Sequence, residues 1–327
     1  MTKLIYNEMV KMIRKKRLWV IALILLVLIP IFTYAQYRTT ENAIKQLGTS
    51  NWRAILQQQI VDQQNRLASA RVPEEWKSYI KISIQQNQYY LDHDINPAAP
   101  GAPTFVRKFA EDAVSLFFPL LVVILAADIV SSEHAGGTIK LLLTRPVARW
   151  KILLSKYITL LFSVSFMLIL TIVFGYLLSG IIFGYDGWTL QVMIGFNQQG
   201  EHLNVDHVQL IPQWKYILMA YGLAWFSCIT VSTISFMVSV LVKNTASSMG
   251  IMLAAVISGS ILSQFAPNWS ALKYLAFTHL SLTEYLEGQP LMLDNVTLPF
   301  SLAVLTAWSV VSLIIAFVTF SKRDVLA

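Results

Sequence analysis

Residues 157–185 read YITLLFSVSFMLILTIVFGYLLSGIIFGY, a stretch of apolar and small polar side chains that contains no charged residue. A helix needs about 20 such residues to cross a bilayer core, and it satisfies its own backbone hydrogen bonds there. The whole chain has this character, because 55% of its 327 residues are hydrophobic and only 13% are charged. Soluble domains carry about a quarter charged residues. The sequence therefore predicts an integral membrane protein.

Six apolar stretches are long enough to be membrane-spanning helices, so we expect an all-α membrane protein. They are residues 18–37, 113–130, 152–183, 214–242, 245–265 and 298–320. The first stretch is longer than the apolar run of a signal peptide and has no small-residue cleavage site after it, so we expect an uncleaved anchor. Residues 1–17 before it are amphipathic and predict a helix lying in the membrane interface. An unstructured basic tail is the alternative.

The distribution of charge predicts that both termini are cytoplasmic. If the N-terminus is inside, the short inside segments hold 13 basic residues against three acids. The outside loops 184–213 and 266–297 hold one lysine against six acids. Basic residues gather on the cytoplasmic side of membrane proteins. Because this excess suits anionic lipid, the net charge of +7 does not require a nucleic-acid partner.

Residues 38–112 form the one sizeable aqueous segment, and they predict a small helical cap outside the membrane. Apolar residues recur at helical spacing in two stretches of it, around Trp52–Leu67 and, after the helix-start signal at Pro73, around Trp76–Tyr90. We expect two amphipathic helices whose stripes serve packing rather than ligand binding. We expect no metal site, because the five-residue spacing of His202 and His207 suits one helical face poorly.

The chain contains no motif for an energy source of its own. A GxxxxGK[ST] phosphate loop and the hydrolase motifs HExxH and GxSxG do not occur in the sequence, so we do not expect an enzyme. Ion-coupled carriers place ionisable groups near the membrane midplane. Here Glu111, Asp112, Asp128 and Lys156 lie near the ends of the predicted spans, so an ion-coupled carrier is the less favoured alternative.

Residues 131–151, SSEHAGGTIKLLLTRPVARWK, predict a short helix lying across the ends of two spans. The second span is expected to continue as a helix past Asp128 towards Glu133, where the following glycines break the backbone. Thr138 can cap a new helix that ends before Pro146. The acidic Glu133 needs a basic partner, which we expect to be Arg145, Arg149 or a group on another subunit. Such a helix could transmit motion to both spans, although basic inside loops also arise for topology alone.

The pattern S-x-E-x-x-x-G-T-I-x-x-L-L-x-x-P-V-x-R, from Ser131 to Arg149, resembles the cytoplasmic region after the second span of type-2 ABC transporter permeases. The basic stretch NEMVKMIRKKR, residues 7–17, is similar to the interfacial helix that precedes their first span. Six spans with inside termini also match their layout. The long outside segment departs from the compact exporters of that family and resembles permease subunits of bacterial export and antibiotic-resistance systems.

This resemblance implies a multi-pass subunit of a bacterial plasma membrane that pairs with a second permease chain. It also implies a separate ATP-binding subunit that carries ATP and Mg²⁺. It implies an ATPase-coupling region that includes Glu133, Gly137, Thr138, Arg145 and Pro146, with a second ATPase contact at Lys11 and Arg14. The substrate path could be lined by Ser247, Ser248, Ser258 and Ser260, although small residues more often serve close helix packing. The alternative from another class is a membrane sensor or scaffold whose cap binds a ligand or partner.

Overall fold

The computed structural model of the protein describes residues 1–69, 72–138, 147–199, 202–265, 269–288 and 296–322. Within these residues, six helical segments are long and apolar enough to cross a membrane. They are Arg17–Leu47, Phe117–Ala135, Arg149–Phe183, Gln213–Leu241, Thr245–Ser263 and Leu298–Lys322. The predicted all-α membrane architecture with six spans is therefore confirmed.

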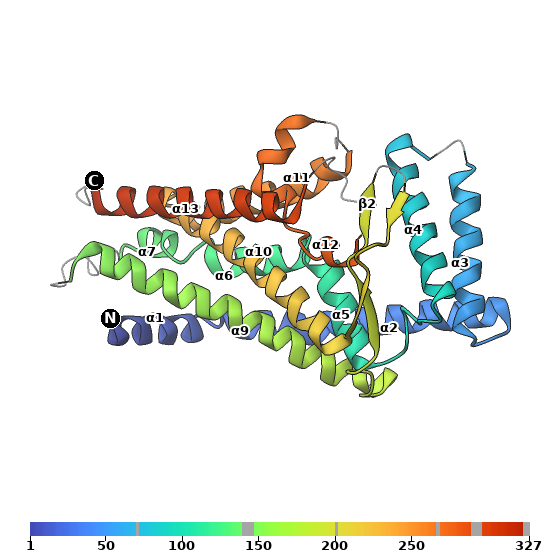
Figure 1. Ribbon diagram of the computed structural model, residues 1–327. Helices are drawn as coiled ribbons and strands as arrows, with labels where there is room; N and C mark the ends of the chain where they lie inside the picture. The colour runs from blue at the N-terminus through green and yellow to red at the C-terminus, as the bar shows by residue number, and fades with distance from the viewer. Residues whose placement is uncertain (70–71, 139–146, 200–201, 266–268, 289–295, 323–327) are drawn as a thin grey trace.

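The elements follow one another along the chain as a helical bundle with a small amount of sheet (Figure 1). The first half contains α1 (Thr2–Arg14), α2 (Arg17–Leu47), α3 (Trp52–Leu67), α4 (Glu74–Asp92), α5 (Ala102–Ala113), α6 (Phe117–Ala126) and α7 (Ser131–Ala135). The second half contains α9 (Arg149–Phe183), β1 (Gln191–Ile194), β2 (Asn197–Gln199), β3 (His202–Asn204), β4 (Gln209–Pro212), α10 (Gln213–Leu241), α11 (Thr245–Phe265), the 3-10 turns η1 (Ser270–Tyr274) and η2 (Ala276–Thr278), α12 (Glu284–Glu287) and α13 (Leu298–Lys322).

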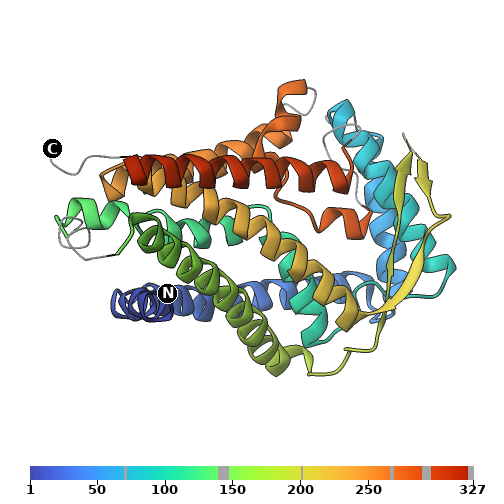
Figure 2. The same ribbon diagram turned by 60° about the vertical axis from the view of Figure 1, so that its left-hand side comes forward.

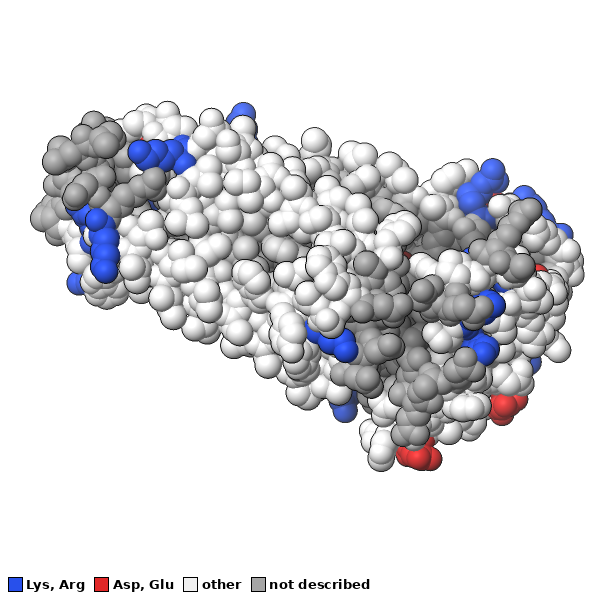
Figure 3. Space-filling view, turned by 90° about the horizontal axis from the view of Figure 1, so that it is seen from above, with Lys and Arg blue, Asp and Glu red and all other residues white. Residues whose placement is uncertain are grey.

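The bundle has two distinct ends. Helix α1, helix α7, the start of α9 and the last turns of α13 lie together at one end, which we call the terminal end (Figures 1 and 2). Helices α3 and α4 and the strands lie at the other, which we call the cap end. On the face drawn in Figure 3, charged side chains gather towards these two ends and leave a wide, largely uncharged surface between them. That surface suits contact with lipid.

Helix α10 is the centre of the bundle, because it packs against α5, α6, α9, α11 and α13. Small and hydroxylated side chains dominate its buried surface, among them Ala220, Ala224, Ser232 and Ser235. Small residues allow helices to approach closely, which is how helices associate in membranes. The outward faces of the surrounding spans instead expose large apolar residues.

The second span departs from the continuous helix that we expected. Regular helix ends at Ala126 and resumes at Ser131, with a turn between them. The side chain of Ser239 on α10 accepts hydrogen bonds from the N–H groups of Val130 and Ser131, each at 3.0 Å. Ser248 on α11 donates to the carbonyl oxygen of Ala127 at 2.5 Å. Neighbouring helices thus supply partners at the turn, as membrane burial requires.

The cap contains the two predicted helices, α3 and α4, packed against each other. Three features of the cap end were not predicted. Helix α2 continues ten residues beyond the expected end at residue 37, α5 is a separate helix, and residues 191–199 and 202–212 form a ribbon of two antiparallel strand pairs. Gly195 within this ribbon has φ +87°, and a Cβ there would lie 2.3 Å from the His207 carbonyl oxygen. Only glycine fits that position.

Candidate functional site

Four charged side chains from three elements meet at the terminal end and form what we call the ion cluster: Glu8, Lys11, Glu133 and Lys156. The ammonium group of Lys156 donates to Glu8 Oε2 and to Glu133 Oε1, at 2.7 Å each. Lys11 Nζ donates to Glu8 Oε1 at 2.8 Å and to Glu133 Oε1 at 3.1 Å. Two carboxylates and two ammonium groups therefore alternate, and their charges balance.

Three members of the ion cluster, Glu8, Glu133 and Lys156, are buried, and Lys11 is half-buried. Glu8 and Lys11 lie one turn apart on α1, so both point to the same side of that helix. Lys156 lies in the second turn of α9 and is only 1% exposed. Burial alone would raise the pKa of Glu8, but the ammonium groups of Lys156 and Lys11 hold that pKa below its ordinary value. Glu8 is therefore ionised at neutral pH.

A second group of polar contacts ties the same region to α2 and the interrupted second span. Arg17, the first residue of α2, forms an ion pair with Asp128 in the turn between α6 and α7. Lys15 Nζ donates to Ser132 Oγ at 2.8 Å. One oxygen of Asp128 and one of Glu133 are buried without a hydrogen-bond partner among the described residues. The region between residues 127 and 133 is thus held by charges from both α1 and the start of α2.

The partner expected for Glu133 was wrong where the structure tests it. Glu133 pairs with Lys11 and Lys156, whereas Arg149 Nη1 donates to the carbonyl oxygen of Ser321 at 3.3 Å. Arg145, the other candidate, lies outside the described residues, as do Pro146 and the short helix expected before it. The sequence distance hid the true partner, because Lys156 follows Glu133 by 23 residues and belongs to another helix.

The remaining residues of the expected coupling region lie close to the ion cluster but in different environments. Arg14 is exposed at the end of α1. Gly137, two residues after the end of α7, has φ +67°, which is the backbone break that its sequence indicated. Thr138 donates from Oγ1 to the carbonyl oxygen of Glu133 at 3.4 Å. In the described part of the chain, Thr138 therefore closes the end of α7.

The four serines considered for a substrate path do not share one environment. Ser248 is buried and bonded to Ala127, which makes it a packing residue of the interrupted span. Ser247 and Ser258 are exposed on α11, and Ser260 is half-buried. Nothing in these positions brings the four hydroxyl groups together.

Two residues of the ion cluster, Glu8 and Lys156, were not singled out as site residues from the sequence. A signal for both was available. Lys156 is a lysine among apolar neighbours near the start of a span, and lysine is almost never fully buried without a partner. Glu8 is the only acid in the basic N-terminal stretch. A lysine among apolar residues and a single acid in a basic stretch each need a partner of opposite charge, so together they indicate a pair.

The side of α1 that faces away from the ion cluster is open. Tyr6 is 71% exposed, Ile13 is 50% exposed and Met9 is 39% exposed. Lys3 and Arg14 are exposed on the same helix. In Figure 2, α1 is seen nearly along its axis while α2 is seen from the side, so α1 runs across the terminal end. The terminal end therefore presents an apolar and basic surface, with the acid of α1 hidden beneath it.

Comparison with known proteins gives one family and two relatives. The family described as protein of unknown function (DUF2705) matches residues 79–326. The chain is 29% identical over 326 residues to the uncharacterized protein YhcI of Bacillus subtilis, which covers 99% of each chain. It is 28% identical over 217 residues to the uncharacterized membrane protein YdbK of the same bacterium, over 65% of this chain and 80% of the relative.

Proposed function

The chain belongs to the family described as protein of unknown function (DUF2705), and we propose that it is the membrane-spanning permease subunit of an ATP-driven ABC transporter. In this proposal two permease chains pair in a bacterial plasma membrane and export a substrate. Each docks at its terminal end, in the cytoplasm, on a separate ATP-binding subunit that carries ATP and Mg²⁺. The chain itself binds no nucleotide and catalyses no reaction.

The ion cluster is the observation that supports this proposal best. It joins α1 and α7, which lie at the terminal end, to Lys156 in the span α9. The ion pair between Arg17 and Asp128 joins α2 to the same region. Separating a buried charge from its partner costs about 3–5 kcal/mol, so these helices resist moving independently. A force applied to α1 or α7 is therefore transmitted to α2 and α9 together.

Burial divides the expected coupling residues into two roles. Glu133 and Lys11 form ion pairs within the chain. We therefore assign them the role of positioning the helices rather than contacting the ATPase. Contact with an ATPase has to come from exposed groups, of which Tyr6, Ile13 and Arg14 are the clearest. A substitution at Glu133 would impair coupling through structure alone, and it cannot by itself identify the docking surface.

The test begins with the intact complex. The tagged full chain is purified from its bacterial host, and we expect a subunit with a GxxxxGK[ST] loop to co-purify. The pair is then reconstituted in proteoliposomes, and ATP hydrolysis is measured for Ile13→Glu and Arg14→Glu. Both variants change only exposed side chains, so we expect normal folding with loss of the permease-dependent ATP hydrolysis.

Arg66→Glu is the matched control, because Arg66 is exposed on α3 at the cap end. It should leave ATP hydrolysis unchanged. If no ATP-binding subunit co-purifies, or if the complexes of Ile13→Glu, Arg14→Glu and Arg66→Glu all hydrolyse ATP as the wild-type complex does, the proposed function is wrong.

A sensor or scaffold is the second candidate, and a separate observation favours it. Helices α2, α3, α4 and α5 line an open cavity of about 800 Å³ at the cap end, although the stripes of the cap helices were expected to serve packing rather than ligand binding. Removal of residues 41–95 distinguishes the two functions. A sensor would lose its response and show no ATP-binding partner, whereas a permease would retain that partner at its terminal end.

A further inference from the structure

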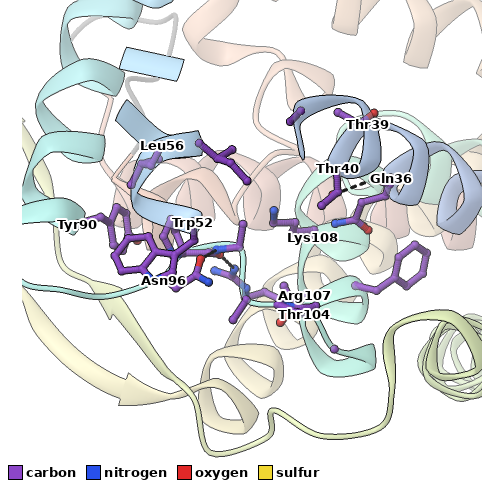
Figure 4. A pocket seen from close by; sticks show the side chains of 18 of the residues that line it. Gln36, Thr39, Thr40, Trp52, Leu56, Tyr90, Asn96, Thr104, Arg107 and Lys108 are labelled. Carbon is purple, nitrogen blue, oxygen red and sulfur yellow. Dashed lines mark hydrogen bonds between the residues drawn. The ribbon is translucent and has the colours of Figure 1, made fainter. Parts of the chain in front are cut away.

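The cavity at the cap end has the size of a small-molecule site. Its volume is about 800 Å³, within the range of ligand pockets. Figure 4 shows Gln36, Thr40 and Lys108 on one side of it and Trp52, Leu56 and Tyr90 on the other, with Arg107 and Thr104 between them. Elements from distant parts of the sequence thus converge on one space.

The cavity lies at the level where the apolar spans give way to polar sequence. The apolar run of α2 ends near Tyr37, and the residues that follow it on α2 line the cavity. Ile182 and Phe183, the last residues of α9, also line it. Aromatic and aliphatic side chains therefore face one part of the space, while amides and hydroxyls face another. An occupant that matches both surfaces is amphiphilic.

Two adjacent cations of α5 face this cavity with unused hydrogen-bonding capacity. Arg107 is only 7% exposed. Its Nη2 donates to the Pro97 carbonyl oxygen at 2.7 Å, and its guanidinium lies over the Tyr216 ring at 5.5 Å. Its Nε is buried and has no hydrogen-bond partner in the described part of the chain. Lys108, the next residue, is half-buried and makes no hydrogen bond or salt bridge with any described residue.

The acids around these cations do not cancel both charges. Glu111 Oε1 lies 4.0 Å from Arg107 Nη1 and is the carboxylate that faces it. Burial, followed by repulsion from Glu111, raises the pKa of Glu287 to about 10, so Glu287 is neutral at pH 7. Glu41 is half-buried and already paired with Lys45 and Arg38. Asp112, also near Lys108, does not line the cavity. Among the residues that line the cavity, Lys108 therefore remains without a counter-charge.

We propose that this cavity binds an amphiphile with a single anionic headgroup, a phosphate or a carboxylate. Lys108 pairs with the headgroup through a charge-assisted hydrogen bond, and the guanidinium of Arg107 adds positive charge beside it. The apolar part of the ligand lies against Leu56, Phe105 and Phe183. The site is formed within one chain, so it does not depend on the transporter assignment.

The experiment measures lipid binding to the intact chain. The full chain is purified in a neutral detergent, and bound molecules are counted by native mass spectrometry. The probes are phosphatidic acid, phosphatidylcholine with the same acyl chains, and inorganic phosphate. We expect selective retention of phosphatidic acid. Lys108→Gln removes one charge-assisted contact, so it should weaken this binding about tenfold.

Two further variants separate the cavity from the general surface. Thr40→Trp fills the cavity from an exposed position on α2 and should abolish selective binding without unfolding the chain. Lys215→Gln removes a lysine that is exposed at the start of α10 outside the cavity, and it should bind phosphatidic acid as the wild type does.

Three results would overturn the proposal. The first is equal retention of phosphatidic acid and phosphatidylcholine, which would mean that the headgroup charge is not recognised. The second is equal loss of binding in Lys108→Gln and Lys215→Gln, which would indicate a diffuse surface effect. The third is equally tight binding of inorganic phosphate alone, which would identify an ion site without the apolar part.

Discussion

Lys156 is the most deeply buried charged residue in the part of the chain that the structure describes. Replacing it with methionine preserves much of its volume but leaves Glu8 and Glu133 with Lys11 alone. Because an unpaired buried carboxylate is costly, we expect Lys156→Met to lower the free energy of unfolding by roughly 3 kcal/mol. Equilibrium unfolding in detergent measures this change. The exposed Lys151→Met variant should unfold as the wild type does, and equal effects of both would contradict the role given to Lys156.

Glu8 makes the stability of the terminal end dependent on pH. Its folded-state pKa lies below the ordinary 4.5, so its ion pairs contribute fully above about pH 4.5 and are lost as the pH falls through the folded pKa. The difference in the free energy of unfolding between wild type and Glu8→Gln should therefore be largest near pH 7 and should disappear in acid. Unfolding midpoints measured from pH 7 to pH 3 test this, and a constant gap would rule out the linkage.

Glu287 should show the opposite dependence. With a folded-state pKa of about 10 against an ordinary 4.5, the folded chain holds a proton that the unfolded chain releases, so stability falls as the pH rises between these values. Glu287→Gln keeps the shape of the neutral acid and should flatten this decline. Unfolding midpoints from pH 5 to pH 9 measure it, with Glu41→Gln as control because Glu41 is paired with Lys45 and Arg38. Equal slopes for wild type and Glu287→Gln would exclude a protonated Glu287.

At the scale of elements, the turn between α6 and α7 depends on α10. Ser239→Ala would leave the N–H groups of Val130 and Ser131 without their shared acceptor, and we expect a loss of about 1–3 kcal/mol. Ser235 on the same helix is equally buried, but its hydroxyl has no partner among the described residues. Ser235→Ala should therefore leave stability unchanged or improve it. Calorimetric unfolding of both variants tests the assignment, which fails if their losses are equal.

Apolar length predicted the spans well but could not mark where their helices end. Helix α2 continues to Leu47 through polar sequence, because a helix that leaves the membrane needs no apolar residues to persist. The interruption at residues 127–130 was hidden because its partners, Ser239 and Ser248, lie more than 100 residues away in sequence. The ion cluster was concealed in the same way, because Glu8 and Lys11 lie more than 100 residues before Glu133 and Lys156. Sequence patterns indicated which charges needed partners, and only the packing of α1 on α9 decided which ones met.

For the whole molecule, six spans place both termini on one side of the membrane, and the charge pattern predicts that this side is cytoplasmic. Cys228 is the only cysteine and is buried, so a single introduced cysteine gives a clear labelling signal. Lys3→Cys and Lys322→Cys should react with a membrane-impermeant maleimide only after the cell membrane is opened. Arg66→Cys at the cap end should react in intact cells. The reverse labelling pattern would show that the termini lie outside the cell and the cap end inside.

Helix α2 connects the terminal end of the molecule to the cap cavity. It is a single helix of 31 residues, about 46 Å long at 1.5 Å per residue. Its first residue, Arg17, holds Asp128 at the terminal end, and its last turns, from Gln36 to Ile44, form a wall of the cap cavity. A tilt of only about 5° over this length displaces the far end by roughly 4 Å, more than the diameter of a water molecule. A rigid tilt of α2 about its charged base would therefore change the width of the cavity at its far end.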